Sequence, residues 1–343
     1  MTPPDICGPP RERGADRLTT DREGRDFRPY GPPVNAPRIT VTRRSHGGNH
    51  MSHNGNGAGY GMVVAVDGSA ESDAAVRWAA REATLRKIPV TVMHVVEPMI
   101  VNWPVPPVQG SVTEWQEANA RNVIKHAHDT FVAVEESAPD GIRHEIRYAG
   151  IVAELVDVSK NATMMVVGSR GLGAFGGALL GSVSSGVIHH AHCPVAVIHG
   201  DQIRRPDPRS PVLVGIDGSP ASEDATAFAF DEASRRRVDL IALHAWSDVG
   251  VFSALGMDWH EYEDQGRELL GERLAGWRER YPDVRVTRQI VCDQPARWLI
   301  DGSRHAQLVV VGSHGRAGFA GMLLGSVGSK VARAAYSPVI VVR

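Results

Sequence analysis

The sequence is poor in the features that disulfide scaffolds, membrane proteins and general nucleic-acid binders require. Three cysteines occur among 343 residues, far apart in the chain, which excludes a disulfide framework and fits a reducing, cytoplasmic location. No apolar run approaches the ~18 residues of a membrane span, so we expect a soluble protein without a membrane partner. The 37 Lys and Arg against 39 Asp and Glu leave a net charge of −2, which argues against nucleic acid as a partner.

Residues 1–58 differ in composition from the rest of the chain. They contain eight Pro and eight Gly but few apolar residues, so burial could not offset the entropy cost of folding. Nine Arg against six acidic residues give the segment a charge of +3, and no apolar core of a secretory signal is present. We therefore expect a disordered tail. A regulatory arm and a later start at Met51 are the alternatives.

An internal repeat organises the remaining chain. Three pairs of segments recur in the same order: Val63–Ser69 with Leu213–Ser219, Val166–Gly171 with Val310–Gly315, and Pro194–Ile198 with Pro338–Val342. A fixed order at similar spacing indicates two copies of one structural unit. The length also predicts two domains at ~150 residues each, which we place at 59–200 and 210–343, with a polar linker at 201–209.

Each copy alternates strand patterns with helix patterns. In the first copy, apolar runs such as Met62–Val66 and Val90–Val96 alternate with helical stretches such as Ser182–His190. Five strands separated by four helices predict an α/β fold: a doubly wound, Rossmann-like parallel sheet with helices on both faces. Such sheets bind ligands beyond the carboxyl ends of their strands, where the strand order reverses.

The most specific motif follows the fourth predicted strand of each copy. Two glycines separated by two residues are followed, after nine more residues, by a Gly-Ser pair that opens a helix. These residues are Gly168, Gly171, Gly181 and Ser182 in the first copy, and Gly312, Gly315, Gly325 and Ser326 in the second. Glycines let backbone N–H groups approach a phosphate, and a helix start adds free N–H groups and a positive dipole end. The identical spacing in both copies favours nucleotide binding over a mobile connecting loop.

The motif contains no P-loop lysine, because GxxxxGK[ST] occurs nowhere in the chain. Positive charge at the phosphates would have to come from backbone N–H groups, from Arg170 or Arg316, and from a divalent ion. The serine hydroxyls that open the helix could cap it or contact a phosphate.

With these repeats and glycine loops, the chain resembles a tandem universal stress protein with two UspA-type domains of the ATP-binding branch. The resemblance covers about residues 59–343. It implies that each domain binds ATP together with Mg²⁺, and that nucleotide occupancy regulates a stress response through an unidentified protein partner. Family members pair through the fifth strand, so the resemblance also implies that the two halves pack as an internal pseudo-dimer. A homo-oligomer, a dimer, is expected as well.

The resemblance further implies individual nucleotide contacts. Asp67 and Asp217, each after a first strand, match the acid that contacts adenosine, although Asp-Gly-Ser is also typical of a turn or helix cap. The positions that would line the adenine pocket are Ala65, Val95, Gly215 and Ala245. The positions that would contact ribose and phosphate are Gly168, Arg170, Gly171, Gly181, Ser182, Val183 and Ser184, and in the second domain Gly312, Gly315, Gly325, Ser326 and Val327. Gly328 replaces Ser184 in the second domain, so we expect weaker binding there.

Two groups of histidines allow more than one interpretation. The cluster in His189–Cys193 could be a metal site, or a basic helix end followed by a buried thiol. The second copy lacks this cluster, which favours the helix end. His94 and His244 recur after the second predicted strand, and we favour a structural role over a place in the adenine pocket.

Enzyme signatures are missing. The chain has no CxxC, no recognisable catalytic triad and no paired carboxylates typical of acid–base catalysis. It also lacks the SGGxDS-type loop and the HIGH and KMSKS signals of pyrophosphatases and synthetases with similar folds, so an adenylating enzyme is not indicated. A nucleotide-dependent regulator is the preferred interpretation. The alternatives are a scaffold protein with degenerate nucleotide sites and a slow ATPase.

Overall fold

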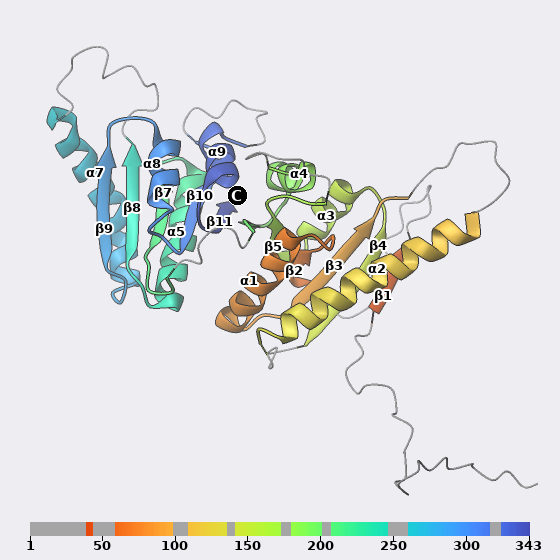
Figure 1. The fold of residues 1–343 in the computed structure, drawn as a ribbon. Helices are drawn as coiled ribbons and strands as arrows, with labels where there is room; N and C mark the ends of the chain where they lie inside the picture. The colour runs from red at the N-terminus through yellow and green to blue at the C-terminus, as the bar shows by residue number, and fades with distance from the viewer. Residues whose placement is uncertain are drawn as a thin grey trace, which may run out of the picture. The chain divides into compact units, whose positions relative to one another are not determined.

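The strands and helices alternate along the chain in the computed structural model (Figure 1). The described residues are 39–43, 59–98, 109–135, 141–172, 180–200, 207–245, 260–315 and 324–343. All of them belong to one compact unit, Pro37–Arg343. The two repeats form two domains of the same topology, as the sequence predicts.

The first domain is a parallel sheet in the order β4-β3-β2-β5-β6. Its strands are β2 (Gly61–Ala65), β3 (Val90–Val96), β4 (Ile142–Tyr148), β5 (Ala162–Gly168) and β6 (Val195–Ile198). Its helices are α1 (Ala70–Arg86), α2 (Gln109–Val132), α3 (Ile151–Ser159) and α4 (Ser182–His190). The strand order reverses between β2 and β5, so this sheet has the switch point of a doubly wound fold.

The second domain repeats this order as β9-β8-β7-β10-β11. Its strands are β7 (Val212–Ile216), β8 (Leu240–Ala245), β9 (Val286–Val291), β10 (Leu308–Gly312) and β11 (Val339–Val342). Its helices are α5 (Pro220–Arg236), α7 (His260–Arg280), α8 (Pro295–Gly302) and α9 (Ser326–Ala334). The switch point here lies between β7 and β10.

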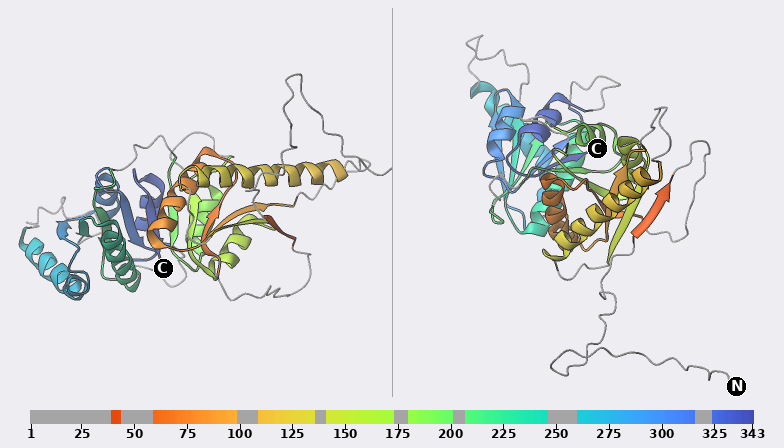
Figure 2. Two further views of the ribbon diagram at one scale, coloured as in Figure 1. Left: turned by 90° about the horizontal axis from the view of Figure 1, so that it is seen from below. Right: turned by 45° about the vertical axis from the view of Figure 1, so that its right-hand side comes forward.

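In each domain, helices cover both faces of the strands (Figure 2). In the first domain, α1 and α2 pack on one face and α3 and α4 on the other. Alanines of α1, among them Ala75, Ala79 and Ala83, are fully buried, so this helix lies close against the strands. Ser69 caps the helix, since its Oγ accepts a hydrogen bond from the Ser72 N–H at 3.2 Å.

The two domains share one sheet. Strand β6 pairs antiparallel with β11, with Ala196 opposite Ile340, and this pairing joins the two halves into one sheet. All four residues of each of these strands are buried. The expected internal pseudo-dimer, formed through the fifth strand of each half, is therefore confirmed.

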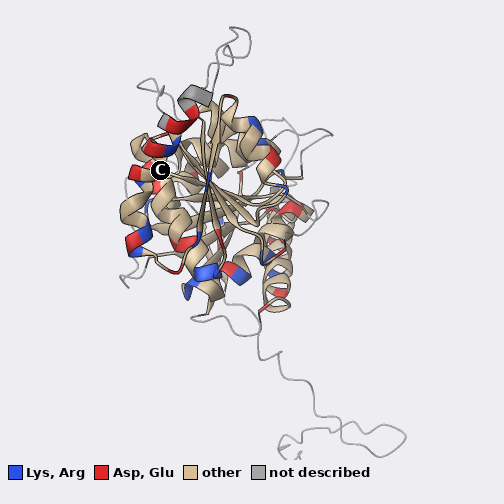
Figure 3. Cartoon of the chain, turned by 90° about the vertical axis from the view of Figure 1, so that its left-hand side faces the viewer, with Lys and Arg blue, Asp and Glu red and all other residues tan. Residues whose placement is uncertain are grey.

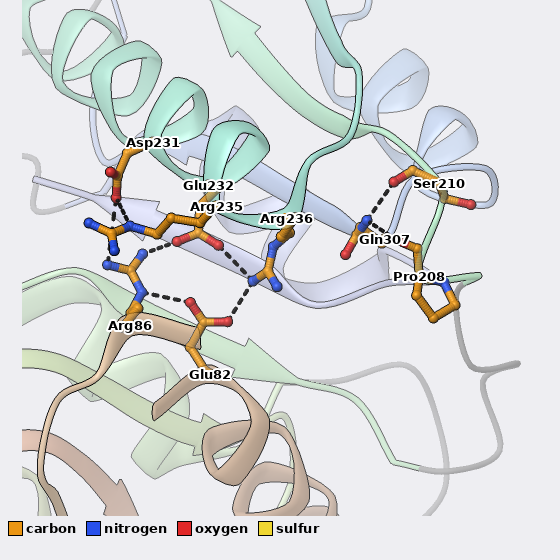
Figure 4. Close-up of polar contacts among 9 residues, drawn as sticks. All are labelled: Glu82, Arg86, Pro208, Ser210, Asp231, Glu232, Arg235, Arg236 and Gln307. Atoms are coloured by element: carbon orange, nitrogen blue, oxygen red, sulfur yellow. Dashed lines mark hydrogen bonds and ion pairs between the residues drawn. The ribbon is translucent and has the colours of Figure 1, made fainter. Parts of the chain in front are cut away.

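A cluster of four charged side chains also connects the domains, where α1 and α5 meet (Figure 4). Arg86 pairs with Glu82 at 2.6 Å and also with Glu232. Arg236 repeats this arrangement, with Glu82 at 2.5 Å and Glu232 at 2.6 Å. Burial and the neighbouring Glu82 carboxylate raise the pKa of Glu232 to about 7. We call these four residues the charge ring.

Strand β1 (Ile39–Arg43) is an addition at the edge of the first domain. It pairs in parallel with β4, with Val41 opposite Ile146. The expectation of disorder over 1–58 is wrong for these five residues, since they form a strand. Their sequence, ITVTR, is rich in β-branched residues, a strand signal that the average composition of the tail conceals. The rest of that segment lies outside the described residues.

Charged positions of both signs are distributed over the helices (Figure 3). No helix in the described part of the chain is long and apolar enough to cross a membrane.

Candidate functional site

The predicted site residues of the first domain come together at its switch point. Asp67 lies just beyond β2, and the segment Gly168–Leu172 lies at and beyond the end of the neighbouring strand β5. Helix α4 starts at Ser182 after the loop. The second domain places Asp217, Gly312–Gly315 and the start of α9 in the same relation.

Asp67 links the end of β2 to the glycine loop. Its Oδ1 accepts a hydrogen bond from the Ser69 N–H at 2.9 Å, and its Oδ2 accepts one from the Leu172 N–H at 3.1 Å. A Cβ at Gly171 would lie 2.5 Å from the same Oδ2, closer than two such atoms can approach. The second glycine of the loop thus leaves room for the Asp67 carboxylate, which a side chain at this position would displace.

The second domain has the same arrangement. Asp217 Oδ1 accepts hydrogen bonds from the Ser219 N–H at 2.9 Å and the Ser219 hydroxyl at 2.7 Å. A Cβ at Gly315 would lie 2.7 Å from Asp217 Oδ2. Both aspartates therefore have the turn role that the Asp-Gly-Ser sequence suggests. Their contact with adenosine stays a prediction.

The first glycine of each loop has a packing role that sequence reasoning missed. A Cβ at Gly168 would lie 2.8 Å from the Glu71 backbone carbon, and a Cβ at Gly312 would lie 2.7 Å from the Ala221 oxygen. These glycines let the first turns of α1 and α5 approach the strand ends. Gly215, expected beside the adenine, faces Leu299 of α8, whose Cδ1 would be 3.0 Å from its Cβ.

The ends of each glycine loop meet at a hydrogen bond. Gly181 N–H donates to the Ser169 oxygen at 2.8 Å, and Gly325 N–H donates to the Ser313 oxygen at 2.7 Å. Gly181 and Gly325 are the N-caps of α4 and α9, so Ser182 is the first residue of its helix rather than its cap.

Neither α4 nor α9 has a side-chain cap, in contrast to α1 and α5, which Ser69 and Ser219 cap. The first N–H groups of a helix without a cap are available to an external acceptor, and the helix dipole favours an anion there. Both helices begin with glycine and serine, which exclude little space. Val183 and Val327, the second residues of these helices, belong to this first turn.

Ser184 is placed differently from the expectation. Its hydroxyl is buried and donates its only proton to the Gly168 oxygen at 2.6 Å. In this arrangement it ties α4 to the end of β5 and offers no proton to a phosphate. A Cβ at its counterpart Gly328 would lie 3.3 Å from the Gly312 oxygen. The weaker binding expected of the second site stays a prediction.

The paired histidines support the aspartate turns. The ring Nδ1 of His94 donates to the Val66 oxygen at 2.6 Å, and that of His244 donates to the Ile216 oxygen at 2.7 Å. Each bonds to the residue directly before the aspartate, which favours the structural role. Burial lowers the pKa of His94. In the sequence, this structural role was indicated by the recurrence of the two histidines at the same position of the repeat.

The predicted adenine-side positions lie near the carboxyl ends of adjacent strands. Ala65 ends β2, Val95 is the penultimate residue of β3, and Ala245 ends β8. Val95 is buried, whereas Ala65 and Ala245 are partly exposed. They stand on the same edge of the sheet as Asp67 and Asp217.

Arg170 lies in the loop of the first domain and forms an ion pair with Glu71, with Nη2 2.9 Å from Oε1. Arg316 lies outside the described residues. Within the described ranges, no group of three His, Cys, Asp or Glu side chains could hold a metal ion.

In the histidine cluster, the Nδ1 of His189 donates to the Ser185 oxygen at 2.6 Å, and burial raises the pKa of the Cys193 thiol to about 12.

Proteins of similar sequence cover most of this chain. The model of the universal stress protein family matches residues 61–199 and 208–343. A universal stress protein of Mycolicibacterium smegmatis is 56% identical over 285 residues, which cover 83% of this chain and 97% of that protein. One of Mycobacterium tuberculosis is 53% identical over 288 residues, covering 82% of this chain and 96% of the relative.

The fold is also found in a solved structure. The crystal structure of a universal stress protein from Archaeoglobus fulgidus superimposes with a TM-score of 0.61 at 21% identity, covering 83% of this chain and 98% of that one. The two family matches coincide with the two repeated domains, and together they span most of the sequence. The chain belongs to the universal stress protein family, with two Usp domains in tandem.

Proposed function

We propose that each Usp domain binds one adenine nucleotide, ATP together with Mg²⁺, at its switch point. The observation that carries this proposal is the start of α4 and of α9. Each begins without a side-chain cap, directly beside a glycine loop that lies against an aspartate of the neighbouring strand end. In the first domain the Leu172 N–H of this loop donates to Asp67. Free helix N–H groups at the switch point of a doubly wound sheet favour a phosphate-bearing ligand.

In this proposal, the residues contact ATP in a defined order along the sheet edge. The phosphates would accept hydrogen bonds from the first N–H groups of α4 and from the Ser182 hydroxyl, with Arg170 supplying a positive charge. Asp67 would accept from a ribose hydroxyl, and the adenine would lie beside Ala65 and Val95. The second domain offers the corresponding groups around Asp217 and Ser326, with His314 at the position of Arg170.

Magnesium fits this site only as part of the nucleotide complex. The described residues contain no set of three metal-binding side chains, and Mg²⁺ commonly binds phosphate oxygens and water with one or two protein carboxylates. When bound, it would neutralise phosphate charge.

Nucleotide occupancy would set a regulatory state in a stress response, in line with membership of the family. We place this role in the cytoplasm, which fits the few cysteines, and we expect it to involve a homodimer and a protein partner. The competing functions are a scaffold that does not use nucleotide and a slow ATPase.

Thermal unfolding of the full chain with and without Mg-ATP tests the proposal. A ligand at 100 times its Kd stabilises the folded state by about 2.7 kcal/mol, a rise in Tm of several degrees. The double variant Gly171→Ala, Gly315→Ala should lose this rise. Gly276→Ala is the matched control, because a Cβ at this exposed glycine of α7 meets nothing within 4 Å. An unchanged Tm of the wild type at millimolar Mg-ATP would favour the scaffold.

A further inference from the structure

The glycine loop of the first domain forms an ion pair with α1, and both residues of this pair are replaced in the second domain. Arg170 and Glu71 are 2.9 Å apart, and their side chains are 37% and 18% exposed. The repeat places His314 and Ala221 at these two positions in the second domain. The second loop therefore has neither this carboxylate nor a permanent cation at the same positions.

Two glycines, Gly168 and Gly200, lie next to Glu71. A Cβ at Gly168 would lie 3.0 Å from the Glu71 Cβ, and a Cβ at Gly200 would lie 3.5 Å from its Cγ. A side chain at Gly168 would crowd Glu71, whereas a Cβ at Gly200 would make only an ordinary contact with it. Glu71 also belongs to the first turn of α1, where the helix dipole favours a carboxylate.

The backbone of Arg170 lies directly at the N-cap of α4. A Cβ at Gly181 would lie 3.4 Å from the Arg170 Cα, and Gly181 N–H is bonded to the preceding residue, Ser169. The Arg170 side chain therefore extends from the helix end where we place the phosphates. Its guanidinium, however, is paired with Glu71. Phosphate and Glu71 are thus alternative partners of one cation.

We propose that Arg170 is exchanged between Glu71 and the bound phosphates, and that this exchange sets the affinity of the first site and its preference for polyphosphates. The inference rests on the proposed function of the same loop. A guanidinium forms bidentate pairs with phosphate oxygens. ATP offers three phosphate groups where AMP offers one, so ATP displaces Glu71 more readily than AMP does. The second site lacks the pair and discriminates less between ATP and AMP.

Titration calorimetry with Mg-ATP and with AMP tests the exchange, in a Gly315→Ala parent that retains only the first site. Glu71→Gln should tighten Mg-ATP binding about fivefold and AMP binding less than about twofold, because it frees Arg170. Arg170→Gln should weaken Mg-ATP binding about tenfold. Glu71→Gln added to Arg170→Gln should then gain less than about twofold, since no cation remains to be released.

Asp73→Asn is the matched control. It removes the other acidic charge from the same helical turn, but Asp73 pairs with His126 at 3.0 Å rather than with Arg170. Its Mg-ATP affinity should stay within about twofold of the parent. A second parent, Asp217→Ala, repeats the series in case Gly315→Ala disturbs folding.

Two results would overturn the exchange while leaving nucleotide binding intact. A fivefold gain from Glu71→Gln that persists without Arg170 would mean that Glu71 acts only by repelling phosphate. An unchanged affinity in Glu71→Gln would mean that the pair does not compete with the ligand. Absence of Mg-ATP binding in the wild type and in both parents would instead refute the proposed function, and the exchange with it.

Discussion

Gly171→Ala should destabilise the chain because of Asp67, and only because of it. A Cβ at Gly171 would lie 2.5 Å from Asp67 Oδ2, so the carboxylate must move by nearly 1 Å to reach an ordinary contact distance of roughly 3.3 Å. That movement breaks the 3.1 Å hydrogen bond from Leu172 N–H. A hydrogen bond to a charged group contributes about 1.5–3 kcal/mol, and we take about 1–2 kcal/mol, since Leu172 is exposed.

Two further effects of the substitution are small or opposite in sign. The backbone of Gly171 is not among the described glycines with positive φ, so alanine introduces no strain there. Loss of backbone freedom in the unfolded state stabilises an alanine variant by about 0.4–1 kcal/mol. We therefore expect a net loss of about 0.5–1.5 kcal/mol in wild type, and no loss or a small gain in the Asp67→Ala background.

A double-mutant cycle measured by urea unfolding isolates this contact. The coupling free energy between Gly171→Ala and Asp67→Ala should be about 1–2 kcal/mol. Gly276→Ala, in open space on α7, should show no coupling with Asp67→Ala. Equal costs of Gly171→Ala with and without Asp67 would refute the steric explanation of the glycine spacing.

Four further predictions concern the charge ring, the buried thiol and a helix cap. Glu82→Ala should cost about 3–5 kcal/mol of unfolding free energy, because Arg236 loses a buried partner; a cost under about 1 kcal/mol would contradict the burial of the ring. With a folded pKa of about 7, above the ordinary 4.5, Glu232 stabilises the fold below pH 4.5 and loses this contribution as the pH rises through 7. The stability of wild type relative to Glu232→Gln, from urea unfolding at several pH values, should thus decrease over that interval, and an increase would contradict it. Cys193, buried and with its pKa raised to about 12, should resist alkylation at pH 8 while the partly exposed Cys292 reacts, as peptide mass spectrometry would reveal. Ser69→Ala should lower the unfolding free energy by about 1 kcal/mol through loss of the α1 cap, whereas Ser182→Ala, at a helix whose cap is Gly181, should change it little.

Much of the fold was predictable because both repeats alternate strand and helix patterns strongly. Val90–Val96 and Ser182–His190 have the predicted bounds. Pro89 and Pro98 lie just outside the apolar strand, and Gly181 directly precedes the helix. The sequence after this strand also predicts a long helix, at 114–137, and the structure has it at Gln109–Val132. Its amphipathic pattern gives the helix but contains no clear start signal, so the boundaries shift.

The candidate site was predictable in position but not in the reasons for its residues. The glycine spacing located the loop, whereas the packing of Gly168 against α1 depends on a helix distant in sequence from it. The inward hydroxyl of Ser184 and the pairing of Arg170 with Glu71 are tertiary contacts of the same kind. No local pattern encodes them. The strand Ile39–Arg43 was not predicted, because its β-branched residues are hidden in the average composition of residues 1–58, which is rich in Pro and Gly.

The central claim is that each domain holds one nucleotide at its glycine loop. Native mass spectrometry of the full chain with Mg-ATP counts bound molecules directly. We predict up to two ATP molecules per chain in wild type, one in Gly171→Ala, one in Gly315→Ala, and two in Gly276→Ala. Wild type without bound ATP, or both loop variants with two, would contradict the account.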